Sequence, residues 1–296
     1  MRAVVFGGAG FLGSHVCDAL SDAGHDVIVF DTRESPYLRP EQTAVVGDIM
    51  DEGLIDDVMT DCEVAYNFAG IADIDEAKAR PVDTIRLNVL GNTLIAEAAC
   101  RNAVRRFLFA SSVYVYSQAG SFYRSSKQAS EMVVESYQRV RGLEYTILRF
   151  GSLYGPRSDT RNGIYRVLHG AMVNRSIEYA GDGEEVREYI HVRDAARLSV
   201  EALGDEFANE VLVLTGHHPM KVRDLLRMVQ EMVGDDTPVR YRGAVSGEHY
   251  DVTPYSFRPR VAKKVVANPY LDLGQGLLEI LGEIHDSLAR NVTRAY

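Results

Sequence analysis

Cysteine is scarce in this sequence, with three residues, Cys17, Cys62 and Cys100, in a chain of 296. They are odd in number, far apart and without a Cys-x-x-Cys pattern, which argues against a disulfide framework or a thiolate metal site. Of the eight histidines only His217 and His218 are adjacent, with no cysteine or third histidine nearby. We expect a loop there rather than a metal site. We predict reduced thiols, no metal and a cytoplasmic location.

Long apolar runs and basic clusters are also missing. No uninterrupted apolar run reaches the roughly 18–20 residues that a membrane-spanning helix needs. The net charge of −10 and the lack of a Lys/Arg-rich block make nucleic acid a poor partner. There is no low-complexity tract, and 46% hydrophobic with 25% charged residues is ordinary for a globular protein. These absences exclude the disordered and fibrous classes and predict no membrane and no nucleic-acid partner.

Short apolar runs alternate with amphipathic stretches through the first half of the chain. We predict strands at residues 3–6, 26–30, 43–46, 63–68, 106–110 and 145–149. Helices are expected at about 10–23, 84–102 and 123–141. This alternation predicts an α/β fold with a parallel, doubly wound sheet.

The pattern changes after Gly151, where turns and short elements of both kinds follow one another. We expect strands near residues 177–179, 188–192 and 211–214, and helices near 194–203, 222–233 and 274–288. We therefore predict a first domain at residues 1–150 and a smaller mixed C-terminal region at 151–296, with room for the two to interleave.

Gly7, Gly10 and Gly13 stand between the first strand and the first helix, with Phe11 and Leu12 among them. In a dinucleotide-binding turn one glycine makes the tight turn, one lets the backbone approach a pyrophosphate, and one lets the helix pack close to the strand. The helix N-terminus then offers N–H groups and a positive dipole end to the phosphates. The pattern favours a Rossmann-type dinucleotide-binding domain over a purely structural turn.

Asp31 ends the second predicted strand, 18 residues after the last of these glycines. A carboxylate at this place can accept from both hydroxyls of a ribose. It would also repel a 2′-phosphate, so Asp31 favours NAD over NADP, although Arg33 would soften this preference. We expect Thr32, next to Asp31, and Asp48-Ile49, after the third strand, to contact the cofactor as well.

Tyr123 and Lys127 lie one helical turn apart at the start of the helix that follows the fifth strand. A buried Lys ammonium stabilises tyrosinate, and the tyrosine then becomes a usable acid or base for a hydroxyl that undergoes hydride transfer. Chance alone gives roughly 0.3 such pairs in a chain of this composition. The position of the pair in the fold therefore decides whether it is interpreted as catalytic. Ser112 ends the fifth strand, at the edge of a parallel sheet where ligands bind. We predict Ser112, Tyr123 and Lys127 as catalytic residues rather than parts of an amphipathic helix with a solvated Lys.

Further motifs follow in order along the chain. They are Asn67-Phe68-Ala69, Asn88-Val89 with Gly91, Leu148-Arg149-Phe150, Tyr154-Gly155-Pro156-Arg157 and Arg187-Glu188-Tyr189-Ile190-His191-Val192. Together with the glycine pattern, Asp31 and the Tyr–Lys pair, they make the sequence resemble the extended short-chain dehydrogenase/reductases. Within this group it is most similar to the NAD-dependent nucleotide-sugar epimerase/dehydratase family, over nearly the whole chain.

The resemblance implies NAD as a bound cofactor and a nucleotide-diphosphate sugar as the substrate. In that family the tyrosine deprotonates a sugar hydroxyl while hydride moves to the nicotinamide. In the 4-epimerases the 4-keto sugar then turns over and takes the hydride back on its other face. The second region binds the nucleoside diphosphate.

The resemblance also assigns residues. Toward the cofactor it adds Phe68, Ala69, Gly70, Asn88, Tyr123, Lys127 and Phe150, the last of which matches an aromatic side chain near the nicotinamide. Toward the substrate it adds Ser152, Arg187 and Arg258. Arg187 matches an arginine that contacts the diphosphate, whereas a charged loop face explains Arg258 equally well. The helix at 84–102 and the helix of Tyr123 match the pair that forms a dimer interface, which implies a homodimer, although their apolar residues could equally be intramolecular core.

Three positions depart from the family pattern. Ser112 and Tyr123 are only 11 positions apart, which predicts a more open pocket. The 4,6-dehydratases carry an Asp-Glu pair directly after the catalytic Thr, and the decarboxylases keep a Glu close by, but Val113 and Tyr114 stand here. Elimination of a 6-hydroxyl needs an added acid and base, so these residues argue against both reactions; Tyr114 could project into the pocket or pack in the core. Ser152 replaces the usual Asn, so the diphosphate contact is expected to differ.

These observations lead to one preferred function and two alternatives. The first is an NAD-dependent 4-epimerase of a nucleotide sugar. The second is a nucleotide-sugar dehydrogenase or ketoreductase with net redox, which would use the same residues. The third is a non-catalytic NAD-binding regulator, against which the Ser112, Tyr123 and Lys127 set argues. The sequence does not identify the nucleotide or the sugar.

Overall fold

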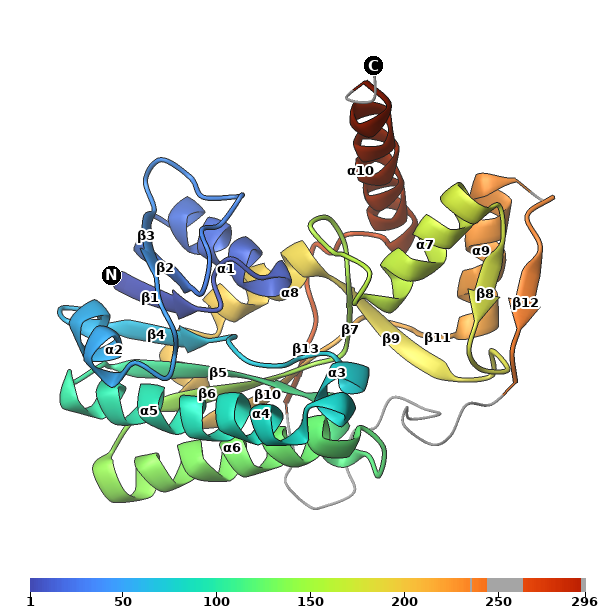
Figure 1. The fold of residues 1–296 in the computed structure, drawn as a ribbon. Helices are drawn as coiled ribbons and strands as arrows, with labels where there is room; N and C mark the ends of the chain where they lie inside the picture. Colours follow the sequence, from blue (N-terminus) through green and yellow to red (C-terminus); the bar gives the residue numbers. More distant parts are fainter. Residues whose placement is uncertain (235, 244–262, 294–296) are drawn as a thin grey trace.

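The computed structural model describes residues 1–234, 236–243 and 263–293, and its centre is an eight-stranded parallel sheet (Figure 1). The strands are β1 (Arg2–Phe6), β2 (Asp26–Asp31), β3 (Thr43–Val46), β4 (Val64–Asn67), β5 (Arg106–Ser112), β6 (Tyr145–Phe150), β10 (Glu210–Leu214) and β13 (Lys263–Val265). Their order is β13-β10-β6-β5-β4-β1-β2-β3, and neighbours pair in parallel. The predicted α/β class with a doubly wound parallel sheet is confirmed.

Helices cover both faces of this sheet (Figure 1). On one face α1 (Phe11–Asp22) and α8 (Val192–Glu201) pack together. On the other lie α2 (Glu52–Met59), α5 (Asn92–Arg101) and α6 (Ser121–Arg141). Alternate residues of β1 point into the two cores, with Val5 on the α1 side and Val4 on the α2 side. Since α8, β10 and β13 come from beyond residue 150, the chain returns to this layer structure after leaving it.

The remaining elements form a smaller lobe. The strands β11 (Pro219–Lys221), β9 (Val186–His191) and β7 (Ser152–Tyr154) make one sheet, and β12 (Val239–Tyr241) pairs with β8 (Ile177–Tyr179) in another. The helices α7 (Gly163–Asn174), α9 (Val222–Val233) and α10 (Leu273–Thr293) enclose a third hydrophobic core with them. The helix α10 projects from the body of the molecule (Figure 1).

The helix predicted at 84–102 is not a regular α-helix. After α3 (Ile74–Ala79), the chain forms α4 (Pro81–Ile85), then a π-helical segment η1 (Arg86–Gly91), then α5. The hydroxyl of Ser130 on α6 donates to the backbone carbonyl of Asn88 within η1, at 2.8 Å. Such wide turns occur frequently at functional sites, and this one faces the helix that carries Tyr123. Short 3-10 turns, η2 (Val113–Tyr116) and η3 (Asp205–Phe207), follow β5 and α8.

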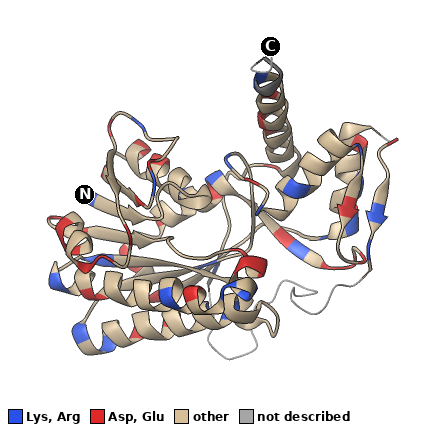
Figure 2. Ribbon diagram, in the orientation of Figure 1, with Lys and Arg blue, Asp and Glu red and all other residues tan. Residues whose placement is uncertain are grey.

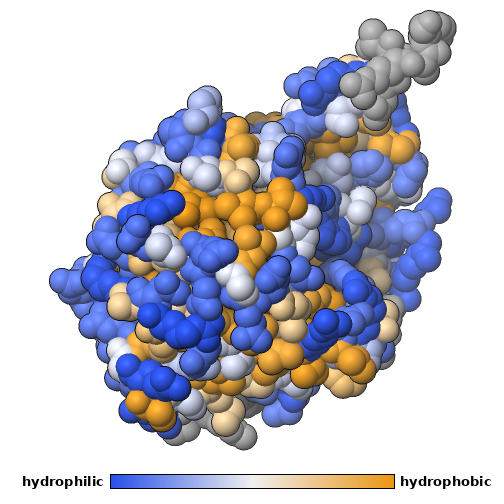
Figure 3. Space-filling model, turned by 60° about the vertical axis from the view of Figure 1, so that its left-hand side comes forward, coloured by the Kyte–Doolittle hydropathy of each residue, from blue (hydrophilic) through white to orange (hydrophobic). Residues whose placement is uncertain are grey.

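Charge is mixed over the elements, with acidic and basic residues interspersed along the helices (Figure 2). On the face shown in Figure 3, hydrophobic residues gather in several patches among hydrophilic ones. Among the described residues, no helix combines the length and the hydropathy that crossing a bilayer requires.

Candidate functional site

The glycine-rich turn lies between β1 and α1 and is closed by backbone contacts. Gly7 has a φ of +79°, in the left-handed region. A Cβ on Gly13 would lie 2.1 Å from the Gly7 carbonyl oxygen, so only glycine allows this approach. Within the described chain no side chain caps the start of α1 at Gly10, which leaves the helix N-terminus for an anion. This turn fits the pyrophosphate of NAD, with Phe11 and Leu12 opening the helix.

Asp31 joins this turn to the end of β2. Its Oδ2 accepts from the Ala9 backbone N–H at 3.0 Å, and its Oδ1 accepts from the Thr32 hydroxyl at 3.3 Å. Asp48 is exposed after β3 and accepts from the Met50 N–H at 3.0 Å. The structure thus places the predicted adenosine-side residues along one edge of the sheet. Their contacts with the cofactor stay predictions.

Ile49 does not share the exposure of its neighbour. It is buried, and a Cβ on Gly91 of η1 would lie 2.6 Å from its Cδ1. In the protein it therefore serves as packing between the loop after β3 and the π-helical segment, whatever contact it makes with a cofactor.

The end of β4 is held by Asn88. Phe68 stacks on Tyr66, and the turn continues through Ala69 to Gly70, whose φ is +132°. The Asn88 amide oxygen accepts from the Ile71 N–H at 2.7 Å, and its amide nitrogen donates to the Ile71 carbonyl at 2.9 Å. A Cβ on Gly70 would lie 2.3 Å from this amide oxygen.

Asn88 also reaches the helix α6, because its amide nitrogen donates to the Ser126 hydroxyl at 2.9 Å. The side chain thus ties the turn after β4 to the helix of Tyr123. This positioning role was missed at the level of the sequence, where Asn88 is predicted only as a cofactor contact. The signal that could have found it is Ser126 itself, next to Lys127.

The three predicted catalytic residues are all buried: Ser112 is 7%, Tyr123 9% and Lys127 6% exposed. The Lys127 Nζ lies 5.9 Å from the centre of the Tyr123 ring and donates to the Ala110 carbonyl at 2.8 Å. Burial lowers the pKa of Lys127 to about 8, while the carboxylate of Glu131 acts in the opposite direction. The ammonium therefore keeps its charge at neutral pH and can favour a phenolate on Tyr123.

Ser112 and Tyr114 lie beside this pair. The Ser112 hydroxyl accepts from the Tyr114 N–H at 3.3 Å, at the start of η2. The ring of Tyr114 packs edge-on against that of Tyr123, with 6.1 Å between the centres. A Cβ on Gly120 would lie 2.7 Å from the Tyr114 ring. Tyr114 is thus fixed beside the candidate catalytic phenol.

Phe150, predicted beside the nicotinamide, and the described residues predicted to bind substrate lie where the smaller lobe meets the sheet. Phe150 ends β6 and is buried, and its ring centre is 6.4 Å from that of Phe68. Ser152 opens β7, which pairs with β9, the strand of Arg187. Arg187 is 8% exposed and donates to the Val186 carbonyl at 3.2 Å. Arg258 lies outside the described residues.

A buried ion pair joins α6, the helix of the candidate catalytic residues Tyr123 and Lys127, to β6. Arg149 on β6 donates through Nε and Nη2 to the two carboxylate oxygens of Glu131 on α6, at 2.9 and 2.6 Å. Glu131 also accepts from the Ser111 hydroxyl, and Arg149 donates to the Tyr116 hydroxyl. Sequence reasoning named Arg149 only within the Leu148-Arg149-Phe150 motif and gave no role to it or to its partners. The available signal is a charged residue inside an apolar strand.

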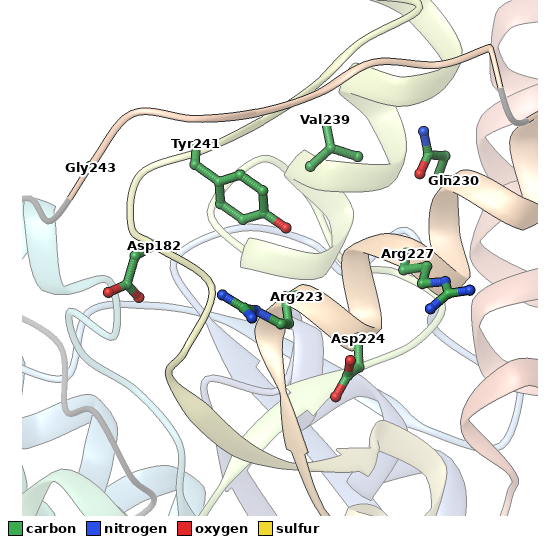
Figure 4. Close-up of a pocket in the computed structure, with 8 residues that line it drawn as sticks. All are labelled: Asp182, Arg223, Asp224, Arg227, Gln230, Val239, Tyr241 and Gly243. Atoms are coloured by element: carbon green, nitrogen blue, oxygen red, sulfur yellow. The ribbon is translucent and has the colours of Figure 1, made fainter.

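A separate open groove of about 610 Å³ lies on the smaller lobe (Figure 4). Its lining residues are Asp182, Arg223, Asp224, Arg227, Gln230, Val239, Tyr241 and Gly243. Arg227 pairs with Glu231 at 3.2 Å and Arg223 with Glu184. None of the predicted site residues that the structure describes is among them. Within the described residues, no group of three or more His, Cys, Asp or Glu side chains could hold a metal ion.

Known proteins resemble this chain over most of its length. The model of the NAD dependent epimerase/dehydratase family matches residues 3–214. The UDP-glucose 4-epimerase of Azospirillum brasilense is 28% identical over 284 residues, which cover 83% of this chain and 82% of that protein. The dTDP-glucose 4,6-dehydratase of an Actinoplanes species is 26% identical over 309 residues, which cover 94% of this chain and 96% of that protein.

Solved structures share the whole fold. The UDP-glucose 4-epimerase of Thermotoga maritima, solved with UDP-glucose, matches 97% of this chain and 100% of its own, with a TM-score of 0.82 and 26% identity. The similarity therefore extends through the smaller lobe, beyond the residues that the family model covers.

Proposed function

Because the chain belongs to the NAD dependent epimerase/dehydratase family and uses NAD as its cofactor, we propose that it is an epimerase that inverts C4 of a nucleotide-diphosphate sugar. The observation that carries this proposal is the buried Tyr123–Lys127 pair next to Ser112, without a carboxyl group in the two positions that follow. Val113 is buried there, and Tyr114 packs on Tyr123. The site thus offers one acid–base group where elimination of a 6-hydroxyl needs more.

The residues of the chain would divide the chemistry as follows. NAD, when bound, supplies the acceptor and donor of a hydride. The Tyr123 phenolate takes the proton of the C4 hydroxyl while the hydride leaves C4, and a C4 ketone forms. Ser112 donates a hydrogen bond to the reacting oxygen, and the Lys127 ammonium favours the phenolate. Return of the hydride to the other face, with the proton from Tyr123, gives the epimer.

The substrate would lie between the sheet and the smaller lobe. Arg187, held on β9, would contact the diphosphate, with Ser152 beside it on β7. Relatives named as acting on UDP-glucose and dTDP-glucose support a nucleotide sugar as the substrate class. We take UDP-glucose as the first probe, since a solved relative of 26% identity holds it.

We also propose that the protein is a cytoplasmic homodimer. Large apolar side chains remain exposed on the outer faces of α4, η1 and α6, which pack against one another: Val82 79%, Leu90 46%, Met132 66% and Val140 77% exposed. A shallow apolar hollow of about 330 Å³ lies on α6 at Ala129, Met132, Val133, Ser136 and Tyr137. A second copy placed here would bury this surface.

A panel of UDP-, dTDP-, GDP- and CDP-hexoses tests the proposed reaction. We expect a mixture of C4 epimers by proton NMR, without net formation of NADH. A 4-keto-6-deoxy product would make the protein a dehydratase, and stoichiometric NADH would make it a dehydrogenase. NAD binding without turnover of any sugar would support the non-catalytic alternative.

Tyr123→Phe tests the assigned acid–base residue. Because the phenol carries the proton, kcat should fall by roughly 10²–10⁴-fold, while the NAD dissociation constant stays within about twofold. Tyr241→Phe is the matched control, because Tyr241 lies on β12 in the smaller lobe and is 44% exposed. Full activity of Tyr123→Phe would show that the chemistry is assigned to the wrong residue.

A further inference from the structure

Two consecutive residues at the end of β5, directly before Ser112, receive contacts from one side of the active site. The Ala110 carbonyl accepts from Lys127, and the Ser111 hydroxyl donates to Glu131, both on α6. The next residue is Ser112. Lys127 and Glu131 are one helical turn apart, so a single face of α6 binds the end of β5, where Ser112 lies.

Glu131 in turn is fixed from the neighbouring strand. Arg149 lies opposite Ser111 in the β5–β6 register and holds both carboxylate oxygens of Glu131 in the bidentate arrangement. Its guanidinium also lies 4.5 Å from the centre of the Tyr116 ring, on the turn that leaves Ser112. Glu131 and Arg149 are 5% and 4% exposed.

We propose that Glu131 and Arg149 are positioning residues that set the place of Ser112 relative to Tyr123 and Lys127. The pair joins the strand of Ser112, through Ser111, to the helix of the other two catalytic residues, and joins the turn after Ser112 through Tyr116. A buried ion pair is weak evidence of stabilisation, because its desolvation offsets its Coulomb energy, whereas its geometry is strict. The pair lies at the junction of β5, β6, η2 and α6. We therefore explain its presence by its role in aligning the reacting groups.

The effect belongs to the chemical step, since among the described residues Glu131 and Arg149 contact each other, β5 and η2 rather than the lobe that holds Arg187. In the proposed reaction, a small displacement of the Ser112 hydroxyl or of the phenol lengthens the hydrogen bonds to the C4 oxygen as charge develops there. Loss of the hydrogen bond that links Ser111 to Glu131 should therefore lower kcat and leave KM for the nucleotide sugar almost unchanged.

Ser111→Ala is the first test, because it removes the link and leaves the Glu131–Arg149 pair intact. We expect kcat to fall roughly tenfold, as a slight misplacement of reacting groups would cause, with KM within about twofold and the melting temperature close to that of the unaltered protein. Ser111→Thr, which restores the hydroxyl, should recover most of kcat. Without NAD, hydrogen–deuterium exchange of the peptide over 106–117 should be faster in Ser111→Ala than in Ser111→Thr.

Glu131→Gln is the second test, and Glu135→Gln is its matched control. Glu135 lies one turn further along α6, is also buried, and pairs with the exposed Arg139 at 3.3 Å. We expect a larger kcat loss for Glu131→Gln than for Ser111→Ala, and near-normal kcat for Glu135→Gln. If Glu131→Gln does not fold, Ser111→Ala with its Thr rescue decides alone.

The inference rests on the proposed function only through the substrate used. If the unaltered protein converts the sugar to a dehydrated or oxidised product, the 4-epimerase proposal is overturned. The kcat test would then follow the formation of that product. Ser111→Ala and Glu131→Gln proteins that fold and keep kcat within twofold of normal would overturn the positioning role. So would a loss found only in KM, or one matched by Glu135→Gln.

Discussion

His15 is a buried residue that joins α1, the helix after the glycine-rich turn, to the segment that follows β7. Its ring on α1 is 6% exposed, and its Nε2 lies 3.1 Å from the Pro156 carbonyl. Burial, helped by the nearby Arg157 guanidinium, lowers the pKa of His15 to about 4. The imidazole is therefore neutral in the folded protein, and its Nε2–H donates to that carbonyl.

This predicts a loss of stability in acid. Above the unfolded pKa of 6.5 both states are neutral, and as the pH falls from 6.5 toward about 4 only the unfolded chain takes up the proton. The difference corresponds to roughly 3 kcal/mol of unfolding free energy. His15→Gln keeps a donor for Pro156 and does not titrate. Between about pH 7 and about pH 4 it should therefore lose roughly 3 kcal/mol less than the unaltered protein in urea unfolding.

The control is His285→Gln, whose side chain is 76% exposed. It should follow the unaltered protein at both pH values. Equal acid losses in the unaltered protein and His15→Gln would contradict a neutral His15 in the folded state.

Residue types and spacings predict only part of the site. Tyr123 and Lys127 can be paired from the sequence because one helical turn separates them, and the three glycines because their turn is local. The pairs Asn88–Ile71 and Glu131–Arg149 cannot, since each joins segments 17 or 18 positions apart through the register of the sheet and its helices.

At the scale of elements, apolar runs are enough to locate the strands of the parallel sheet other than β13 (Lys263–Val265), for which the sequence predicted no strand. The prediction at 43–46 coincides with β3, and that at 26–30 with all of β2 except its last residue. A periodic pattern cannot reveal the π-helical turn η1, because the contact with Ser130 comes from another helix. The π-helical turn η1 thus results from packing between helices rather than from helix propensity.

The exposed face of α4, η1 and α6 yields a prediction about assembly. Met132→Glu places a charge at the centre of the apolar hollow and should convert a dimer into a monomer in sedimentation velocity. Met232→Glu is the matched control, because Met232 on α9 is 36% exposed in the other lobe. An unaltered protein that sediments as a monomer would contradict the homodimer, and so would a dimer that survives Met132→Glu.

At the scale of the molecule, side-chain contacts hold the smaller lobe against α1, the helix after the glycine-rich turn. Arg157 donates to Asp18 of α1 at 2.6 Å, its guanidinium lies 4.4 Å from the centre of the Tyr37 ring, and its N–H donates to Glu283 of α10 at 3.0 Å. These contacts cross between regions that the sequence divides at residue 150. A boundary drawn by composition cannot show that β10 and β13 belong to the large sheet, because β10 pairs with β6 across 64 positions (Thr146 with Glu210) and β13 pairs with β10 across 51 (Leu212 with Lys263).

In the proposed reaction, hydride leaves C4 of a nucleotide sugar and returns to the same carbon. UDP-glucose carrying deuterium at C4 tests it most directly, with the products followed by NMR and mass spectrometry. We predict that both epimers keep the deuterium at C4 and that none is lost to water or to released NADH. Deuterium found at C6 or in free NADH, or replaced at C4 by solvent hydrogen, would contradict the account.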